Sequence, residues 1–249
     1  MNDRHAQILD VVNEYKKVEV NRLAEMLDVS QVTIRKDLDI LAERGLLDRE
    51  HGYALCRKAD DVNNKLAVRY ESKMKIAVAA AEMVSDGETI MVESGSSCTL
   101  LAEQVAKTKK DITIITNSAF IASYIRDKGN VRIILLGGEY QRETQAMVGP
   151  LLKKFANEFF VDKLFIGTDG FIPKVGFTSG EMMRMEAVHN MAESARQVII
   201  LTDSSKFQKQ GVVLQFRFSE VSKIVTDSGV SDEVKKLLEK NHIDVTVAY

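Results

Sequence analysis

The stretch LDVSQVTIRKDLDIL, residues 27–41, predicts a tight turn that leads into a helix. Ser30 is suited to cap this helix, because its hydroxyl can accept a hydrogen bond from an N–H of the first turn. Ile34, Leu38 and Leu41 recur at the spacing of one helical face, so we expect that face to be buried. The opposite face should therefore be free for contacts.

The free face begins with side chains that can donate hydrogen bonds to base edges or to phosphates. They lie in the N-terminal half, the part of a recognition helix that enters the major groove of DNA. The candidate DNA-binding residues of the turn and helix are Ser30, Gln31, Thr33, Arg35 and Lys36.

Two further apolar stripes precede the turn and predict two more helices. They are formed by Val20, Leu23, Ala24 and Leu27, and by Ile8, Val12 and Tyr15. Three helices of this kind are the minimum core of a helix-turn-helix.

The segment LLDREHGYALC, residues 46–56, predicts a small hairpin after Gly45, which we expect to end the helix. Such a hairpin would be a wing, with Arg49 and His51 near its tip to approach phosphates or the minor groove. Leu47, Tyr53 and Leu55 are expected to pack inward. The alternative for residues 1–56 is a helical packing or oligomerisation module with ordinary solvated charges.

The composition indicates a globular protein with one small and one medium domain, since 249 residues carry 45% hydrophobic and 28% charged side chains. No apolar run reaches the length of a membrane span and MNDRHAQ lacks a secretory pattern, so we expect a cytoplasmic protein. Cys56 and Cys98 lack partners at metal-ligand spacing, so no disulfide framework, metal or cofactor is predicted. A net charge of −2 argues against a nucleic-acid coat, but a local basic face suffices for sequence-specific DNA binding.

The chain changes character after a polar connection that we place at residues 57–74, between a DNA-binding domain at 1–56 and an effector-sensing and oligomerisation domain at 75–249. Seven apolar runs predict strands at 89–93, 112–116, 131–136, 163–167, 197–202, 223–226 and 245–248. Because helical stretches alternate with most of these runs, we expect an α/β domain with a mostly parallel sheet covered on both faces.

Ligands of such sheets bind beyond the carboxyl ends of the strands, so the loops there hold the candidate effector-binding residues. The loop after 89–93 predicts an anion cradle, in which small residues expose backbone N–H groups and a helix opens near Cys98 or Thr99. A plain strand-to-helix turn is an equally weighted alternative. The candidates in all five loops are Glu93, Ser94, Gly95, Ser96, Ser97, Thr99, Asn117, Ser118, Gly137, Gly138, Arg142, Asp169, Gly170, Glu181, Asp203 and Lys206.

Each candidate also has an ordinary structural alternative. Ser118, Asp169 and Glu181 could be turn or capping residues, and the double glycine at 137–138 could serve a tight turn. Lys206 could hold a ligand phosphate as a point charge or pair with Asp203. The cluster of Met182, Met183, Met185 and Met191 is expected to fill a core or an interface.

The stretch VSQVTIRKDLDILAERGLLDREHGYA, residues 29–54, is similar to the start of the DeoR family of bacterial transcriptional regulators, and the similarity continues to the C-terminus. The resemblance implies a winged helix-turn-helix followed by an effector domain resembling ribose-5-phosphate isomerase, in a dimer or tetramer. Lys36 stands where a second arginine is common, and HGYA lacks the double glycine usual after the wing histidine. Glu93 replaces the aspartate of a D-x-G-[ST]-T segment that the family uses for sugar-phosphate recognition.

Three functions remain in view. The first is a regulator, expected to repress a sugar or sugar-alcohol catabolic operon, that leaves operator double-stranded DNA when a phosphorylated sugar or polyol binds. The second is an active sugar-phosphate isomerase with a DNA-binding head. In the related isomerases an aspartate and a lysine near the sugar transfer protons, and Asp203 and Lys206 raise the same question here. No carboxylate is marked as a general base by spacing, so we expect no catalytic residues. The third is a DNA-binding protein whose second domain only oligomerises.

Overall fold

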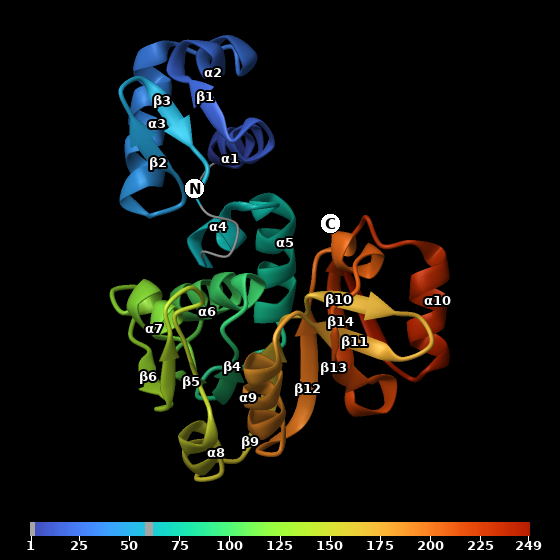
Figure 1. Ribbon diagram of the computed structural model, residues 1–249. Helices are drawn as coiled ribbons and strands as arrows, with labels where there is room; N and C mark the ends of the chain where they lie inside the picture. Colours follow the sequence, from blue (N-terminus) through green and yellow to red (C-terminus); the bar gives the residue numbers. More distant parts are fainter. Residues whose placement is uncertain (1–2, 58–61) are drawn as a thin grey trace. The chain divides into compact units, whose positions relative to one another are not determined.

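The computed structural model describes residues 3–57 and 62–249, which form two compact units, Met1–Glu71 and Ser72–Tyr249 (Figure 1). The elements of the first unit are α1 (Asp3–Tyr15), β1 (Lys17–Glu19), α2 (Val20–Met26), α3 (Gln31–Glu43), β2 (Asp48–Glu50), β3 (Tyr53–Leu55) and α4 (Val62–Ala67). The three strands pair antiparallel in the order β1-β3-β2. This is the predicted winged helix-turn-helix, with α2 and α3 on either side of the turn.

The ends of α3 are set as the sequence predicts. The Ser30 hydroxyl accepts a hydrogen bond from the Thr33 N–H at 3.2 Å, and Ile34, Leu38 and Leu41 are fully buried. The helix stops at Gly45, whose φ of 71° lets its N–H bond the Ala42 carbonyl at 2.8 Å. This left-handed glycine satisfies carbonyls of the last turn and redirects the chain toward the wing.

The wing closes through a two-residue turn, in which His51 and Gly52 both have positive φ, 26° and 86°. The second glycine usual after the wing histidine would stand at position 53, where φ is not positive, so Tyr53 fits there without backbone strain. The prediction that Tyr53 packs inward is wrong: Tyr53 is 38% exposed and the buried residue of β3 is Ala54. Neighbouring residues of a strand face opposite sides, so burial of Ala54 turns Tyr53 outward, where Lys17 lies over its ring.

Two other details of the first unit differ from prediction. Tyr15, expected in the core, is 43% exposed at the last residue of α1, where Arg22 lies over its ring. The segment 57–74, predicted as a polar connection, contains α4 and the start of α5 (Tyr70–Ala81), because Leu66, Ala67 and Tyr70 are buried. Residues 58–61 of that segment lie outside the described residues.

A buried carboxylate joins the first and third helices. Asp37 of α3 accepts hydrogen bonds from Arg4 at 2.5 Å and from His5 at 3.0 Å, both on α1. Burial alone would raise the pKa of Asp37, but the bonds from Arg4 and His5 outweigh it and hold the pKa below its usual value. The contact fixes the buried side of α3 while its opposite side stays exposed.

The second unit is built on one seven-stranded sheet. Its strands are β4 (Thr89–Val92), β5 (Thr113–Thr116), β6 (Arg132–Leu135), β9 (Val161–Ile166), β12 (Ala195–Leu201), β14 (Lys223–Asp227) and β15 (Asp244–Ala248). They lie in the order β15-β14-β12-β9-β4-β5-β6, and every neighbouring pair is parallel. All seven predicted strands are confirmed, as is the α/β class.

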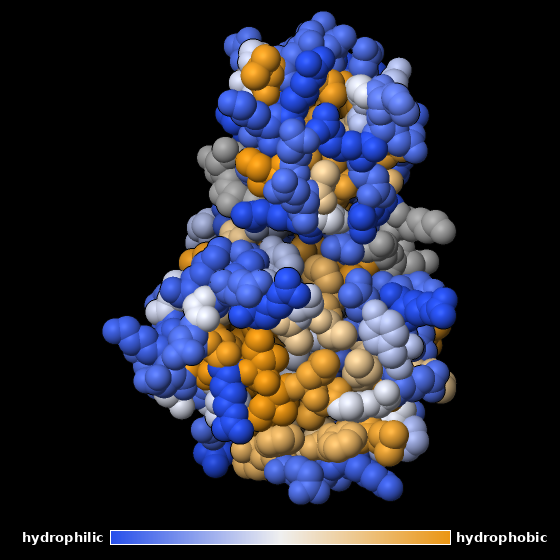
Figure 2. Space-filling view, turned by 90° about the vertical axis from the view of Figure 1, so that its left-hand side faces the viewer, coloured by the Kyte–Doolittle hydropathy of each residue, from blue (hydrophilic) through white to orange (hydrophobic). Residues whose placement is uncertain are grey.

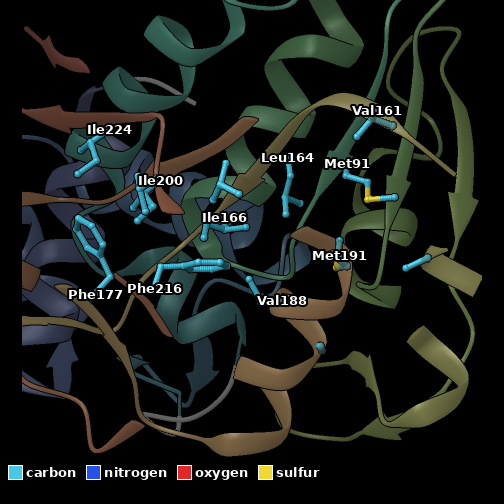
Figure 3. Close-up of a cluster of buried hydrophobic side chains, with 14 of the residues drawn as sticks. Met91, Val161, Leu164, Ile166, Phe177, Val188, Met191, Ile200, Phe216 and Ile224 are labelled. Atoms are coloured by element: carbon cyan, nitrogen blue, oxygen red, sulfur yellow. The ribbon is translucent and has the colours of Figure 1, made fainter. Parts of the chain in front are cut away.

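Helices cover both faces of this sheet, as Figure 1 shows. They are α5, α6 (Ser96–Thr108), α7 (Ala119–Ile125), α8 (Pro150–Ala156), α9 (Met182–Ala192) and α10 (Asp232–Lys240), with short 3-10 turns η1 (Ser204–Gln208) and η2 (Phe218–Glu220). Residues on one sheet face, such as Met91 and Leu164, join a large core with α8, α9 and α10 (Figure 3). Their neighbours Ile90 and Phe165 point the other way and are also fully buried.

Five short strands of the second unit were not predicted from the sequence. They are β7 (Glu139–Gln141), β8 (Ala146–Val148), β10 (Gly170–Ile172), β11 (Gly176–Ser179) and β13 (Val213–Arg217). β7 pairs with β8, and β10, β11 and β13 form a separate antiparallel sheet. Three to five residues are too few to show a clear alternation of polar and apolar positions.

The methionine cluster only partly follows its prediction. Met191 is fully buried and Met183 packs against the core, but Met182 is 63% exposed at the start of α9.

Among the described residues, no helix is long and apolar enough to cross a membrane.

The contact of Asp37 yields a prediction about acid stability. A carboxyl whose pKa is lowered by folding stabilises the folded state at every pH above its unfolded pKa, which is about 3.9 for aspartate. This stabilisation is lost as the pH falls through the pKa that the carboxyl has in the folded state. Asp37→Asn should therefore weaken hydrogen-exchange protection of α3 amides in the full chain at pH 7, with a smaller difference from wild type at strongly acidic pH.

Asp39→Asn is the matched control, because Asp39 lies on the same helix but is exposed and pairs with Arg49 at the surface. Surface pairs contribute little to stability. Equal protection of α3 in the two variants at pH 7 would contradict the role of Asp37.

Candidate functional site

The sheet reverses its direction of winding between β4 and β9. From β4 the chain proceeds outward through β5 to β6, and it then returns to the other side of β4 and proceeds outward through β9, β12, β14 and β15. In open α/β sheets the crevice at this reversal, beyond the carboxyl ends of the strands, is the usual ligand site. The candidate site therefore lies where the loops after β4 and β9 separate.

The Glu93 carboxylate joins these two loops. One oxygen, Oε2, accepts the N–H of Gly95 at 2.9 Å and the N–H of Gly167 at 3.1 Å, and Oε1 accepts the Ser94 hydroxyl at 3.0 Å. The side chain is buried, and burial raises the pKa of Glu93, although the Gly167 N–H and the nearby Arg184 act in the opposite direction. Glu93 thus joins the loops after β4 and β9 at the floor of the crevice.

The predicted anion cradle has the backbone for its role. α6 begins at Ser96, two residues earlier than expected, and its N-cap Gly95 offers no side chain to cap the first turn. Ser94 and Ser97 are buried beside it, and Thr99 donates its hydroxyl back to the Gly95 carbonyl at 3.1 Å. A helix of 13 residues with an uncapped first turn at a sheet crevice is suited to bind an anion.

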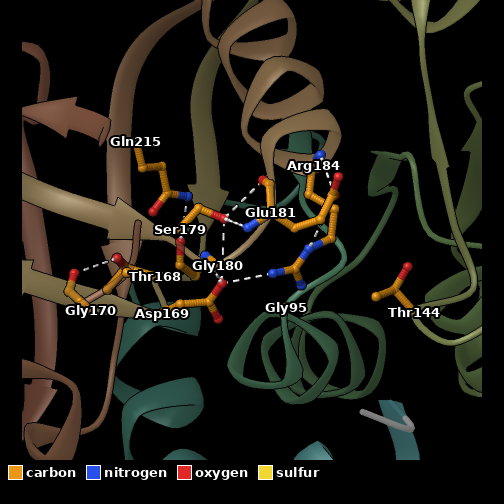
Figure 4. A network of polar contacts seen from close by, with 12 residues as sticks. Gly95, Thr144, Thr168, Asp169, Gly170, Ser179, Gly180, Glu181, Arg184 and Gln215 are labelled. Atoms are coloured by element: carbon orange, nitrogen blue, oxygen red, sulfur yellow. Dashed lines mark hydrogen bonds and ion pairs between the residues drawn. The ribbon is translucent and has the colours of Figure 1, made fainter. Parts of the chain in front are cut away.

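A polar network closes the β9 side of the crevice (Figure 4). Asp169 accepts hydrogen bonds from the Gly180 N–H at 3.0 Å and from the Arg184 guanidinium at 2.7 Å. Glu181 caps α9 by accepting the N–H groups of Met183 and Arg184, both at 2.8 Å. Burial raises the pKa of Glu181, but these N–H groups outweigh it and lower the pKa overall. Asp169 and Glu181 therefore have the structural roles named as alternatives, and they position Arg184.

Three further residues of this network are functional candidates that no sequence motif indicated. Arg184 is 18% exposed between Asp169 and Glu181, and Gln141 of β7 donates to Glu181 at 3.3 Å. Gln215 of β13 donates to the Gly167 carbonyl at 3.0 Å, and no residue of the described ranges bonds its buried side-chain oxygen. Only the spacing of Arg184 one turn into α9, on the side of Glu181, could have indicated it from sequence.

The loop after β5 has a mixed outcome. Ser118 caps α7 by accepting the Ile121 N–H at 3.1 Å, which is its structural alternative. Asn117 is buried and donates to the Met147 carbonyl at 3.1 Å, while its own side-chain oxygen has no hydrogen-bond partner among the described residues. Asn117 remains a candidate to receive a ligand hydroxyl.

The glycines after β6 serve close packing. A Cβ at Gly137 would lie 2.9 Å from the Phe155 ring, and one at Gly138 would lie 2.5 Å from the Val148 carbonyl oxygen. At Gly170 an added Cβ would lie 2.7 Å from the Lys209 carbonyl oxygen. Arg142 is exposed in the turn between β7 and β8. Tight backbone approach thus accounts for all three glycines.

The loop after β12 presents a cation. Asp203 caps η1 and accepts the N–H and the hydroxyl of Ser205, at 3.1 and 2.5 Å. Lys206 follows on the same turn and is half-buried. Asp203 is therefore a capping residue, while Lys206 stays a candidate for ligand binding.

The first unit presents a coherent candidate DNA face. Ser30, Gln31, Arg35 and Lys36 are exposed and Thr33 is half-buried, as a recognition helix requires. Val32, which the sequence did not single out, is 61% exposed on the same turn and offers a methyl surface for a thymine. On the wing, His51 is exposed, but Arg49 forms an ion pair with Asp39 of α3.

Family comparisons agree with both units. A family described as "DeoR C terminal sensor domain" matches residues 68–228, and one described as "DeoR-like helix-turn-helix domain" matches residues 4–59. The chain belongs to the DeoR family. This DeoR-family chain is a transcriptional regulator with a DNA-binding helix-turn-helix, and the matching families are regulators rather than enzymes.

Relatives of this DeoR-family chain match it over nearly its whole length. The transcriptional repressor AccR of Agrobacterium fabrum is 29% identical over 96% of this chain and 94% of that protein. The L-fucose operon activator of Haemophilus influenzae is 29% identical over 98% of each chain. The glycerol-3-phosphate regulon repressor of Escherichia coli is 28% identical over 97% of each chain. Repressors and an activator therefore stand among relatives of similar sequence identity to this chain.

Solved structures match parts of the chain. Ribose 5-phosphate isomerase A from Neisseria gonorrhoeae is 17% identical, with a TM-score of 0.40, over 54% of this chain and 52% of that chain. The enzyme from Methanocaldococcus jannaschii is 18% identical, with a TM-score of 0.41, over 55% of this chain and 54% of that chain.

The close approach of Gly95 to Glu93 yields a prediction. A Cβ at Gly95 would lie 2.9 Å from the Glu93 oxygen, which two N–H groups hold in place, whereas a Cβ at Gly167 would lie 3.6 Å away, in ordinary contact. Gly95→Ala should therefore lower the free energy of unfolding by about 1–3 kcal/mol, the usual cost of overpacking. Calorimetric unfolding of the full chain measures it.

Gly167→Ala is the matched control, at the other end of the same contact, and it should cost clearly less. Equal destabilisation by the two alanines would show that the Glu93 carboxylate does not constrain the crevice.

Proposed function

We propose that the chain binds operator double-stranded DNA through residues 1–56 and releases it when a phosphorylated sugar or polyol binds in the crevice of residues 75–249. The observation that carries this proposal is the uncapped start of α6 beside the Glu93 floor, at the reversal of the sheet. The location that this function requires is the cytoplasm.

The phosphate of the effector is assigned to the N-terminus of α6. Backbone N–H groups at a helix start bind a dianion without further cations, and the small residues from Ser94 to Ser97 allow it to come close. Lys206 would add a point charge from the β12 side.

The hydroxyls of the effector are assigned to the polar groups around the crevice. Asn117 has a buried side-chain oxygen without a hydrogen-bond partner, and Arg184 is held at the opposite side by Asp169. These groups differ in position and in donor character, so they are suited to distinguish sugars that share one phosphate. They support selective binding rather than a general anion site.

The hydrogen bonds of the acidic side chains favour ligand binding over catalytic turnover of the ligand. Asp203 accepts two hydrogen bonds from Ser205, and Asp169 is bound by Arg184 and the Gly180 N–H. A general base needs a carboxylate oxygen that can reach a substrate proton. Asp203, the acid that the isomerase alternative would use, is thus engaged in capping η1, and Asp169 is engaged with Arg184.

Relatives named for L-fucose and glycerol-3-phosphate regulation support an effector from carbohydrate metabolism. Repression is the sign of regulation that we propose, since most of the relatives cited above are repressors. A homo-oligomer, a dimer or a tetramer, follows from the need to place two recognition helices on two half-sites.

The DNA face yields a prediction for the recognition helix. Arg35→Ala should weaken operator binding and, if Arg35 reads a guanine, relax specificity at one base pair by about 1–3 kcal/mol. Fluorescence anisotropy with a panel of single-base operator variants measures both effects.

Arg44→Ala is the matched control, because Arg44 is equally exposed but caps the other end of α3. Operator affinity that is the same in the Arg35 variant as in wild type would remove Arg35 from the interface.

The effector site yields a separate prediction. Lys206→Ala should leave operator binding unchanged but raise the concentration of phosphorylated sugar needed to release DNA, because one cation near the phosphate is lost. Titration of the protein–operator complex with each sugar phosphate measures this, and Lys209→Ala, at an exposed lysine three residues later, is the control. An unchanged release curve for the Lys206 variant would exclude Lys206 from the site.

A further inference from the structure

The start of the recognition helix α3 carries one apolar side chain among hydrophilic ones. Val32 is the second residue of this helix and is 61% exposed. Figure 2 looks at the side of the first unit on which α3 and β2 lie in Figure 1, and hydrophilic side chains cover most of that surface. A single exposed valine is common on protein surfaces, so its exposure alone indicates no ligand. The place of Val32 on the helix is what distinguishes it.

The two hydroxyl groups at this helix start are engaged with each other. The Ser30 hydroxyl accepts the Thr33 N–H at 3.2 Å and lies 2.9 Å from the Thr33 hydroxyl. Both side chains therefore serve the cap that begins α3. The exposed side chains that remain on the first two turns are Gln31, Val32, Arg35 and Lys36.

These four side chains differ in what they can contact on DNA. Gln31, Arg35 and Lys36 can each donate to a base edge or to a phosphate, and a phosphate contact positions the protein without reading sequence. Val32 ends in methyl groups, which gain nothing from a phosphate. In the major groove the apolar group that a methyl surface can pack against is the C5-methyl of thymine. A contact of Val32 with DNA is therefore a contact that depends on sequence.

The charges beside Val32 favour DNA as its partner. Val32, Arg35, Lys36 and Asp39 recur at the spacing of one side of α3. Asp39 alone would repel phosphate, but it forms an ion pair with Arg49 of the wing. Arg35 and Lys36 thus give this side of the helix a positive charge next to Val32, which attracts the DNA backbone.

We propose that Val32 is a specificity-determining residue of the operator interface, where it packs against the C5-methyl group of a thymine in the major groove. The proposal rests on the DNA-binding part of the proposed function and deepens it, and it does not involve the effector. A protein partner fits this position less well, because a stable protein interface buries about 800 Å² on each side, and Val32 is one apolar side chain among hydrophilic neighbours.

Replacement of single thymines by deoxyuridine tests the proposal, because it removes the methyl group and leaves the hydrogen-bonding groups of the base unchanged. The full wild-type chain first selects DNA duplexes from a random-sequence library, and each thymine of the tightest duplex is then replaced in turn. Wild type should lose about fourfold in affinity at one thymine of a half-site, the effect of one methyl group removed from an apolar contact. Val32→Ala should bind the thymine and deoxyuridine duplexes equally.

Two further variants separate this contact from a general effect on α3. Val32→Ile keeps an apolar side chain and should keep the preference for thymine. Ile40→Ala is the matched control, because Ile40 is also an exposed apolar residue of α3 (39%) but lies eight residues later, so this variant should discriminate as wild type does. Alanine is a better helix former than valine, so loss of the preference in Val32→Ala would not reflect a weakened helix.

The outcomes distinguish this proposal from operator binding itself. A selected duplex in which no thymine depends on its methyl group would overturn the role of Val32 and leave operator binding intact. The same holds if Val32→Ala retains the full preference for thymine. Failure of the wild-type chain to select any duplex over random sequence would contradict operator binding, and the role of Val32 with it.

Discussion

The Glu93 carboxylate is the contact on which the crevice of the second unit depends, because it accepts N–H groups from the loops after both β4 and β9. The sheet reverses its winding between these two strands, which is where open α/β sheets usually bind their ligands. A buried carboxyl that binds both loops fixes their separation. It also explains why a glycine stands at position 95, since a Cβ there would lie 2.9 Å from one of its oxygens.

Once the floor is fixed, the distribution of charge determines what the crevice can hold. Its other acids are occupied with structural tasks: Asp169 holds Arg184, Glu181 caps α9, and Asp203 caps η1. The helix start at α6 and the cation Lys206 are left for a ligand. A phosphorylated sugar matches this arrangement, because its anion and its hydroxyls need different partners at opposite sides of one small site.

The fold was predictable from sequence where many residues repeat one pattern, and the site was predictable only as a region. The continuous apolar runs of the seven parallel strands and the stripe of Ile34, Leu38 and Leu41 gave a strong signal. The role of Arg184 was missed, because it depends on Asp169 reaching it from a loop 15 residues away. Tyr53 was placed on the wrong side of the wing, since three residues of strand are too few to set the alternation.

A regulator must change its DNA affinity when its effector binds, and the described chain offers a crevice for the effector and an exposed helix for the DNA. The decisive measurement is thermal unfolding of the full chain against phosphorylated sugars and polyols, with the matching unphosphorylated compounds as controls. A selective site stabilises the protein by about 2.7 kcal/mol at a ligand concentration of 100 times Kd, so one or a few phosphorylated compounds should raise Tm. No rise with any phosphorylated compound, or an equal rise with its unphosphorylated control, would contradict a sugar-phosphate sensor.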